Sequence, residues 1–188
     1  MHLRIPLVVT LGMLTMLVGC KSSRPPITTA PKVELARFMG PWYVIGNIPT
    51  SIEREAFNPV EDYKLDADGT IATTFSFREG SLDGPLKTYC PRGFVLDTRS
   101  NAVWGMRFVW PIKADYRIVY VSENYEHTIV GREKRDYLWI MARTPQIADA
   151  DYEAMLAIAK REGYDLSRVR RVPQHWPESS PRPGGECS

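Results

Sequence analysis

The sequence predicts an all-β domain: an eight-stranded antiparallel up-and-down β-barrel with one carboxy-terminal α-helix packed outside it. Strand-like runs recur at intervals of roughly ten residues, each bounded by turn residues and with no helical crossover between them. Such short links make neighbouring strands antiparallel, and eight antiparallel strands can close into a barrel without free edges. The one strong helical pattern, over residues 149–163, follows the last of these runs.

Eight runs make up the predicted barrel. The third run shows the strand pattern most clearly, because Ile71, Phe75 and Phe77 alternate with small or polar side chains that face the other way. A barrel of eight strands is either filled by side chains or open to one small ligand. The expected bounds of the runs are 42–48, 57–65, 70–78, 86–96, 102–110, 116–121, 127–131 and 137–143.

The helical pattern carries charges at its ends that suit the helix dipole. Acidic residues lie near its amino end, and basic residues and a glycine lie near its carboxyl end. Its apolar residues repeat at helical spacing, so we expect one face to pack on the barrel. The residues in question are Asp149, Asp151, Tyr152, Met155, Leu156, Ala159, Lys160, Arg161 and Gly163.

Composition limits the classes of function. The chain has 24 Lys and Arg against 22 Asp and Glu, with no long run of like charge, so no nucleic-acid partner is expected. Its 188 residues suffice for one domain with a sizeable core. Five Trp, nine Tyr and six Phe fall mostly in the alternating runs, so they either fill the core or line a cavity.

The amino terminus has the pattern of an export signal. Residues 1–19 have a basic start and an apolar stretch that is shorter than the roughly 20 residues of a bilayer span. The stretch ends in Leu17-Val18-Gly19-Cys20, which resembles the lipobox of bacterial lipoproteins. This resemblance implies that Cys20 is acylated and that residues 20–32 form a lipidated tether to the membrane. An ordinary signal peptide with a chance cysteine is the alternative.

The residue after the cysteine bears on location. Lys21 is not the aspartate that is linked with inner-membrane retention in enteric bacteria. The lipoprotein resemblance therefore favours the outer membrane, with the leaflet undecided and the periplasmic face favoured.

Three motifs give the barrel a family resemblance. Gly40-Pro41-Trp42-Tyr43 opens the first strand, and Arg143 follows the last one, directly before Thr144-Pro145. Residues 120–125 match a middle motif more loosely, because its usual Thr-Asp-Tyr is not intact. Together they resemble the lipocalins, and most of all the outer-membrane lipocalins of bacteria. The resemblance covers residues 33–172 and leaves 173–188 as a Pro-rich tail.

The resemblance implies structural roles for the motif residues. Trp42, two positions after Gly40, would plug the closed end of the barrel, and Arg143 would cross its ring. Cys90 and Cys187 remain once Cys20 carries lipid, and an exported chain meets an oxidising compartment, so one disulfide is expected. Cys90 lies in the fourth expected strand, 86–96, and a disulfide from this strand to the carboxy-terminal tail also recurs among lipocalins. Two free thiols, or pairing between molecules, are the alternatives.

The resemblance further implies a calyx that binds an acyl chain, with a fatty acid or lysophospholipid as the ligand. Arg107 and Lys113 lie near the expected open end, where they would meet a phosphate head group. A homodimer is a further possibility, through Trp104 or Trp110 exposed at the mouth. The expected calyx residues are Phe75, Phe77, Trp104, Met106, Phe108, Trp110, Tyr116, Ile118 and Tyr120.

Few residues in the sequence are candidates for catalysis or for binding a metal ion. His127 and His175 have no Cys or Asp at metal-ligand spacing, so no metal, no cofactor and no catalytic residue are expected. The carboxylates of Glu53, Glu61 and their neighbours are expected to be solvated. The favoured function is a membrane-anchored protein that binds, stores or transports hydrophobic ligands for envelope maintenance. The alternatives are an isomerase or de-epoxidase on the same scaffold, or a structural lipoprotein with a filled barrel.

Overall fold

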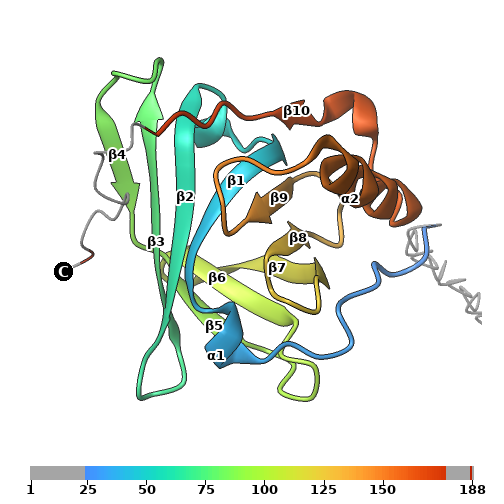
Figure 1. The fold of residues 1–188 in the computed structure, drawn as a ribbon. Coiled ribbons are helices and arrows are strands. Elements are labelled where there is room, and N and C mark those ends of the chain that lie inside the picture. The colour runs from blue at the N-terminus through green and yellow to red at the C-terminus, as the bar shows by residue number, and fades with distance from the viewer. Residues whose placement is uncertain (1–23, 177–186, 188) are drawn as a thin grey trace, which may run out of the picture.

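The computed structural model describes residues 24–176 and 187, and it contains an antiparallel barrel with one long helix beside it (Figure 1). The sequence order of the strands is also their order around the barrel, and β1 pairs with both β2 and β9, which closes it. The strands are β1 (Gly40–Ile48), β2 (Ala56–Leu65), β3 (Ile71–Glu79), β4 (Leu86–Tyr89), β5 (Arg92–Val95), β6 (Val103–Val109), β7 (Ile112–Val121), β8 (His127–Gly131), β9 (Leu138–Ala142) and β10 (Arg170–Arg171).

The predicted eight-stranded barrel is confirmed, with one strand divided in two. The run expected at 86–96 is interrupted at Cys90 and Pro91, so that β4 and β5 pair with different parts of β3. Proline has no backbone N–H to donate, and this explains a break in the ladder at Pro91. Two short strands, β4 and β5, therefore take the place of one continuous fourth strand.

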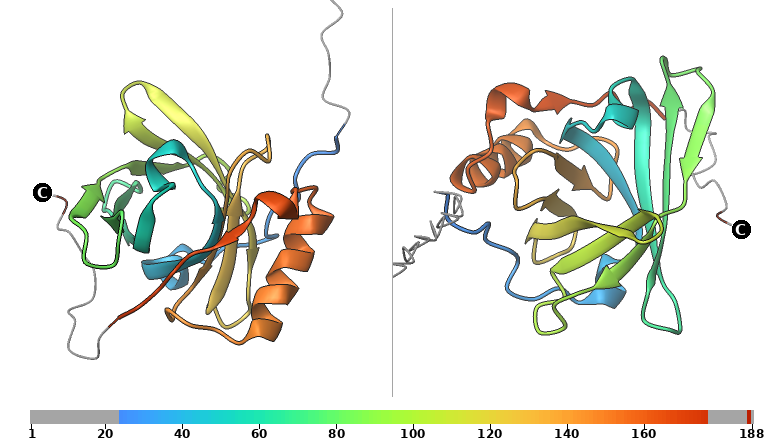
Figure 2. Two further views of the ribbon diagram at one scale, coloured as in Figure 1. Left: turned by 90° about the horizontal axis from the view of Figure 1, so that it is seen from above. Right: turned by 180° about the vertical axis from the view of Figure 1, so that it is seen from behind.

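The long helix covers one side of the barrel, as predicted. Helix α2 (Asp149–Arg161) buries Tyr152, Met155 and Ala159 in an apolar cluster that includes outward-facing residues of β1, β8 and β9. Gly46 permits this approach, because a Cβ there would lie 2.6 Å from the Tyr152 hydroxyl. The view from above in Figure 2 shows α2 alongside the wall.

Three short helices complete the fold. They are α1 (Leu35–Phe38) and the 3-10 turns η1 (Ser51–Glu53) and η2 (Leu166–Arg168). Among the described residues, no helix has the length and apolar character needed to cross a membrane.

One end of the barrel is closed by an aromatic core. Trp42 is fully buried, and its Nε1 donates to the carbonyl oxygen of Phe38 at 2.8 Å. The Arg143 guanidinium lies over the indole ring, 3.7 Å from its centroid, and donates to the carbonyl oxygens of Pro41, Arg37 and Phe38. Burial lowers the pKa of Arg143 to about 10, so it stays charged at neutral pH. The side chain thus ties α1 to the starts of β1 and the end of β9.

The amino-terminal segment runs along the outside of the barrel from one end to the other. Its start is held by the β8–β9 loop, where Arg135 donates to the Pro25 carbonyl and the Glu133 carboxylate accepts from Ile27 N. Farther on, Val33 N donates to the Ser100 carbonyl at the closed end. In Figure 1 this segment is the blue coil that leads to α1.

The carboxy-terminal segment fills a gap in the wall. Strand β1 pairs with β2 only over its first half, and β10 takes the free edge at Gly46 and Asn47. The Gln174 amide then donates to the carbonyls of Val44 and Pro59, one on each strand, at 2.9 Å. This segment therefore joins β1 to β2 where their own ladder has ended.

The predicted disulfide is present. Cys90 and Cys187 are bonded, with their Cα atoms 5.7 Å apart and a separation of 97 positions in the sequence. Closing a loop of this length stabilises the folded chain by roughly 4–5 kcal/mol in the chain-entropy model.

The closed end makes a direct stability prediction. Trp42→Ala should lower the free energy of unfolding by about 3–5 kcal/mol, because a large buried ring and its contact with Arg143 are both lost. Urea unfolding followed by circular dichroism measures this. Trp110→Ala is the matched control, since that ring is 78% exposed and its loss should change stability by less than about 0.5 kcal/mol. Equal effects of the two substitutions would contradict the role given to Trp42.

Candidate functional site

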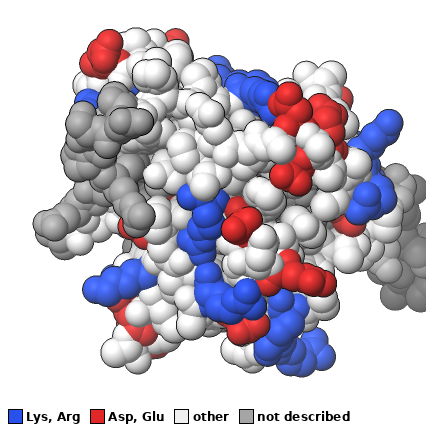
Figure 3. Space-filling view, viewed as in Figure 1, with Lys and Arg blue, Asp and Glu red and all other residues white. Residues whose placement is uncertain are grey.

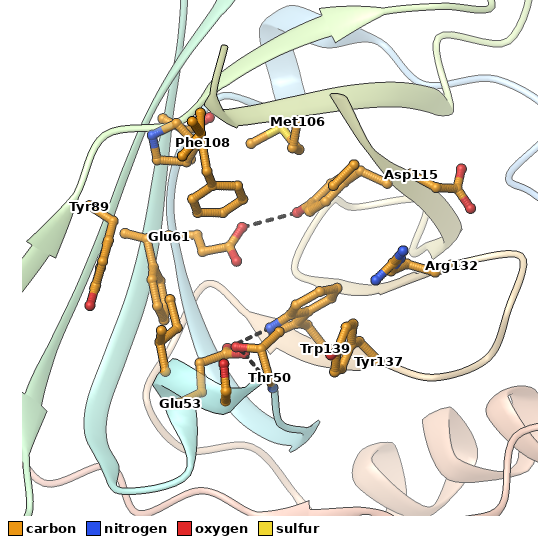
Figure 4. A pocket seen from close by; sticks show the side chains of 18 of the residues that line it. Thr50, Glu53, Glu61, Tyr89, Met106, Phe108, Asp115, Arg132, Tyr137 and Trp139 are labelled. Carbon is orange, nitrogen blue, oxygen red and sulfur yellow. Dashed lines mark hydrogen bonds between the residues drawn. The ribbon is translucent and has the colours of Figure 1, made fainter. Parts of the chain in front are cut away.

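The barrel holds a cavity of about 490 Å³ that opens at the end opposite Trp42. This volume is within the usual range for a pocket that encloses a small organic ligand. The β1–β2 loop, the β6–β7 hairpin and the β8–β9 loop form its rim. Figure 4 shows the side chains that point into it, which include Thr50, Glu53, Glu61, Tyr89, Met106, Phe108, Asp115, Arg132, Tyr137 and Trp139. A filled barrel is therefore not what the structure shows.

Four of the nine expected calyx residues line this cavity. They are Phe75 on β3, Met106 and Phe108 on β6, and Tyr116 on β7. Phe77 is buried next to them, with its ring centroid 5.3 Å from that of Phe75 and 6.1 Å from that of Tyr89.

The other four lie elsewhere. Trp104 and Ile118 are fully buried in the aromatic core of the closed end, below the cavity. Tyr120 faces the α2 side, because a bulge between Ile118 and Tyr120 breaks the alternation along β7. Trp110 is exposed at the tip of the β6–β7 hairpin, so the expectation that all nine share the calyx is corrected here. Pairing of two copies through the mouth stays a prediction, and it would involve Trp110 and not Trp104.

The two cations expected at the mouth point outward. Arg107 and Lys113 both lie over the Phe94 ring on the outer wall, 4.7 and 3.9 Å from its centroid. Each precedes or follows an inward residue, and side chains alternate along a strand. Among the basic residues that the structure describes, Arg132 lines the cavity, with its guanidinium 5.1 Å from the Tyr137 ring centroid.

A buried carboxyl group lies at the inner part of the cavity. Glu61 comes from β2, is 7% exposed and accepts a hydrogen bond from the Tyr116 hydroxyl at 3.0 Å. The Tyr63 hydroxyl also bonds to the same carboxylate oxygen and to the Tyr116 hydroxyl. Burial, with a smaller contribution from Glu53, raises the pKa of Glu61 from 4.5 to about 8. Burial and Glu61 likewise raise the pKa of Tyr116 well above its usual value.

A second carboxylate is buried nearer the rim. Glu53 ends η1, where one carboxylate oxygen accepts from Thr50 N at 2.9 Å and from the Thr50 hydroxyl at 2.5 Å. The other oxygen accepts from Trp139 Nε1 at 2.6 Å. Arg170 donates to the carbonyls of Glu53 and Arg54 and so fixes the turn. The carboxylate is fully paired, and it holds the Trp139 indole against the cavity.

Sequence reasoning missed these carboxyl groups, which it expected in solvent. Glu61 was identifiable by its position, because it lies two residues before Tyr63 on the same strand and therefore faces inward with it. Tyr137 and Trp139 had the same signal, since they alternate within the last strand run. The local sequence marks Glu53 only as the last residue of a Thr-x-x-Glu capping box with Thr50, and its hydrogen bond to Trp139 comes from a strand 86 residues away.

The arrangement suits binding of an apolar molecule. The cavity wall is largely aromatic and aliphatic, and only a few polar groups project into it. Within residues 24–176 and 187, no cluster of three or more His, Cys, Asp or Glu side chains has the geometry to hold a metal ion. Basic and acidic side chains lie interspersed on the face shown in Figure 3.

Comparison with known sequences gives a consistent result. The model of the family described as Lipocalin-like domain matches residues 33–174. The chain is 31% identical to the outer membrane lipoprotein Blc of Citrobacter freundii, over 90% of this chain and 97% of that protein. It is 28% identical to temperature-induced lipocalin-1 of Arabidopsis thaliana, over 80% of this chain and 86% of the relative.

Solved structures share the fold at lower sequence identity. Insecticyanin from the tobacco hornworm Manduca sexta superposes with a TM-score of 0.64 at 14% identity, covering 83% of this chain and 87% of its own. The cockroach allergen Per a 4 gives 0.62 at 19% identity, covering 82% and 97%. These likenesses support the barrel architecture alone.

The raised pKa of Glu61 makes stability depend on pH. Between about pH 4.5 and 8 the folded state keeps this proton and the unfolded state has lost it, so stability falls as the pH rises through that window. Glu61→Gln removes the titrating group and therefore this dependence of stability on pH. Its free energy of unfolding should therefore exceed that of the wild type by more at about pH 9 than at about pH 5, as measured by urea unfolding. Glu79→Gln is the control at an exposed carboxylate, and identical pH dependence in wild type and Glu61→Gln would contradict the assignment.

Proposed function

The chain belongs to the lipocalin family, and from that premise we propose that it binds, stores or transports an acyl-chain ligand as a lipid-anchored protein of the outer membrane. The ligand class is a fatty acid or a lysophospholipid, whose chain enters the barrel. No bond is made or broken in this function.

The open cavity is the observation that carries the proposal. Phe75, Met106 and Phe108 offer an apolar wall, and each methylene moved from water to such a wall contributes about 0.8 kcal/mol. The volume of about 490 Å³ is large enough for several such groups to be buried together. Tyr116 and Trp139 add flat aromatic surface for a chain to lie against.

The anchor rests on the sequence and on the named relatives. Cys20 and the signal peptide, residues 1–19, lie outside the described residues, and so does most of the tail at 173–188. The relatives called outer membrane lipoprotein in Citrobacter freundii and Escherichia coli each align with this chain over 97% of their length. Their names support an outer-membrane lipoprotein, while lipidation at Cys20 and the periplasmic face rest on the sequence of this chain alone.

Filling the cavity should abolish binding. Ala114→Trp places an indole inside the barrel, and it should weaken the binding of a fluorescent fatty acid by at least about 10-fold, because the chain loses its space. Fluorescence titration of the delipidated domain measures this. Lys113→Trp is the matched control, because this neighbour points to the outer wall over Phe94 and should keep wild-type affinity. No saturable binding to the wild type would defeat the proposal.

The lipid anchor has its own test. Cys20→Ala should abolish the incorporation of labelled palmitate and move the protein from the membrane fraction to the soluble periplasmic fraction, because the acceptor thiol is lost. Cys187→Ala keeps Cys20 and should keep the label. Equal labelling of the Cys20→Ala variant and the wild type would show that the anchor is elsewhere or absent.

A further inference from the structure

An acyl chain explains the walls of the cavity but not the polar atoms at its inner part. Glu61 uses one carboxylate oxygen, Oε2, for the hydroxyls of Tyr63 and Tyr116. Its other oxygen, Oε1, makes no hydrogen bond to any described residue, and Glu61 is one of the residues that line the cavity (Figure 4). The network therefore leaves one carboxyl oxygen of Glu61 free for the ligand.

A second polar residue lies in the wall of the same space. Thr73 is 2% exposed and lines the cavity, yet its hydroxyl has no hydrogen-bond partner among the described residues. Thr73 lies opposite Tyr63 in the β2–β3 ladder, while Glu61 lies opposite Phe75. Thr73 and Glu61 are therefore diagonal neighbours on one inner face, a relation that places residues roughly 7–8 Å apart. A ligand group that reached both side chains would pair the two polar atoms.

A plain hydrocarbon chain does not suit these atoms. A methylene offers neither a donor nor an acceptor, so a chain packed against Glu61 and Thr73 would keep them unpaired and shield them from water. A site built around such groups discriminates strongly against a ligand that lacks the matching polar atom. The inner end of the cavity thus favours a ligand with a polar atom on its buried part.

The charge of that polar atom follows from its neighbours. The carboxylate of a fatty acid would lie beside the carboxyl groups of Glu61 and Glu53, and burying it there is unfavourable. Glu61 is largely protonated at neutral pH because its pKa is about 8, so a cationic group would lack a full counter-charge. A hydroxyl is neutral, and it can donate to one neighbour while it accepts from another.

We propose that Glu61 and Thr73 form a subsite for a hydroxyl group on the buried part of the ligand, so that hydroxylated acyl chains are the preferred ligand class. The ligand hydroxyl accepts from the protonated Glu61 carboxyl at Oε1 and donates to the Thr73 hydroxyl oxygen. This inference rests on the proposed function, since it names the ligand of the same cavity.

The experiment compares matched ligands. A positional series of monohydroxylated octadecanoic acids and octadecanoic acid itself compete with a bound fluorescent fatty acid on the delipidated domain. At least one hydroxylated isomer should bind about 10-fold or more tightly than the unsubstituted acid, because it alone pairs the two buried groups.

Three variants locate the preference. Thr73→Val keeps the shape of the side chain and removes its hydroxyl, and Glu61→Met removes the carboxyl group. Each should reduce the preference to less than about 3-fold, and Glu61→Met should bind the unsubstituted acid more tightly than the wild type does. Thr74→Val is the matched control, because Thr74 is the next residue on the same strand and its hydroxyl bonds to Cys187 Sγ, outside the barrel. Circular dichroism and thermal unfolding confirm that each variant is folded.

The outcomes separate the two proposals. If octadecanoic acid binds as tightly as every hydroxylated isomer, the subsite is overturned and the acyl-chain function stands. If Thr74→Val removes the preference as fully as Thr73→Val does, the subsite is also overturned. If no member of the series binds the wild type, the acyl-chain function itself fails.

Discussion

The contact between Arg143 and Trp42 is the interaction on which the rest of this structure depends. The guanidinium carries a charge that is partly buried, so its donors must be paired, and they are paired with carbonyls at the ends of three separate segments. The same Phe38 carbonyl accepts from both the indole and the guanidinium. One side chain thus joins α1, β1 and the β7–β8 turn, and the barrel is closed at that end by bonds rather than by a covering loop.

Closing one end in this way determines where a ligand can go. Phe38 packs against Trp42 with tilted rings, and Trp104 packs edge to face on both Phe38 and Tyr63, so that aromatic rings fill the closed end. The space that remains lies above them and is reached from the rim alone. The tyrosine hydroxyl of Tyr63 projects upward from this packing to Glu61, so the top of the aromatic core is also the polar inner end of the cavity.

The barrel, the outer helix and the disulfide were predictable because each has a local or compositional signal. Alternation predicts strands, charged ends predict α2, and two thiols in an exported chain predict one bond. The candidate site was less predictable, because a single bulge changes which side chains face inward. The bulge beside Val119 turns Tyr120 away from the cavity. A second bulge, in β6, allows the neighbouring residues Phe108 and Val109 both to line the cavity. Local sequence does not mark a bulge, since it depends on the partner strand.

Carboxyl groups were the other source of error. A Glu in an exposed-looking strand is solvated in most proteins, and burial of Glu61 becomes evident only when Tyr63 and Tyr116 are seen to meet it across the barrel. Glu53 depends in the same way on Trp139. Groups that are paired across a barrel cannot be recognised from either strand alone.

The course of the amino-terminal segment would set the orientation of a molecule anchored through Cys20. Pro25 is held by Arg135, in the loop that also brings Arg132 to the cavity rim. Pro25 lies five positions after Cys20, and a fully extended chain spans at most about 18 Å over five positions. A lipid on Cys20 would therefore be connected by a short peptide segment to a point beside the cavity opening. The exposed Trp110 and Ile112 lie on the same rim. The opening would stay next to the bilayer, and an apolar molecule would pass between the two with little time in water.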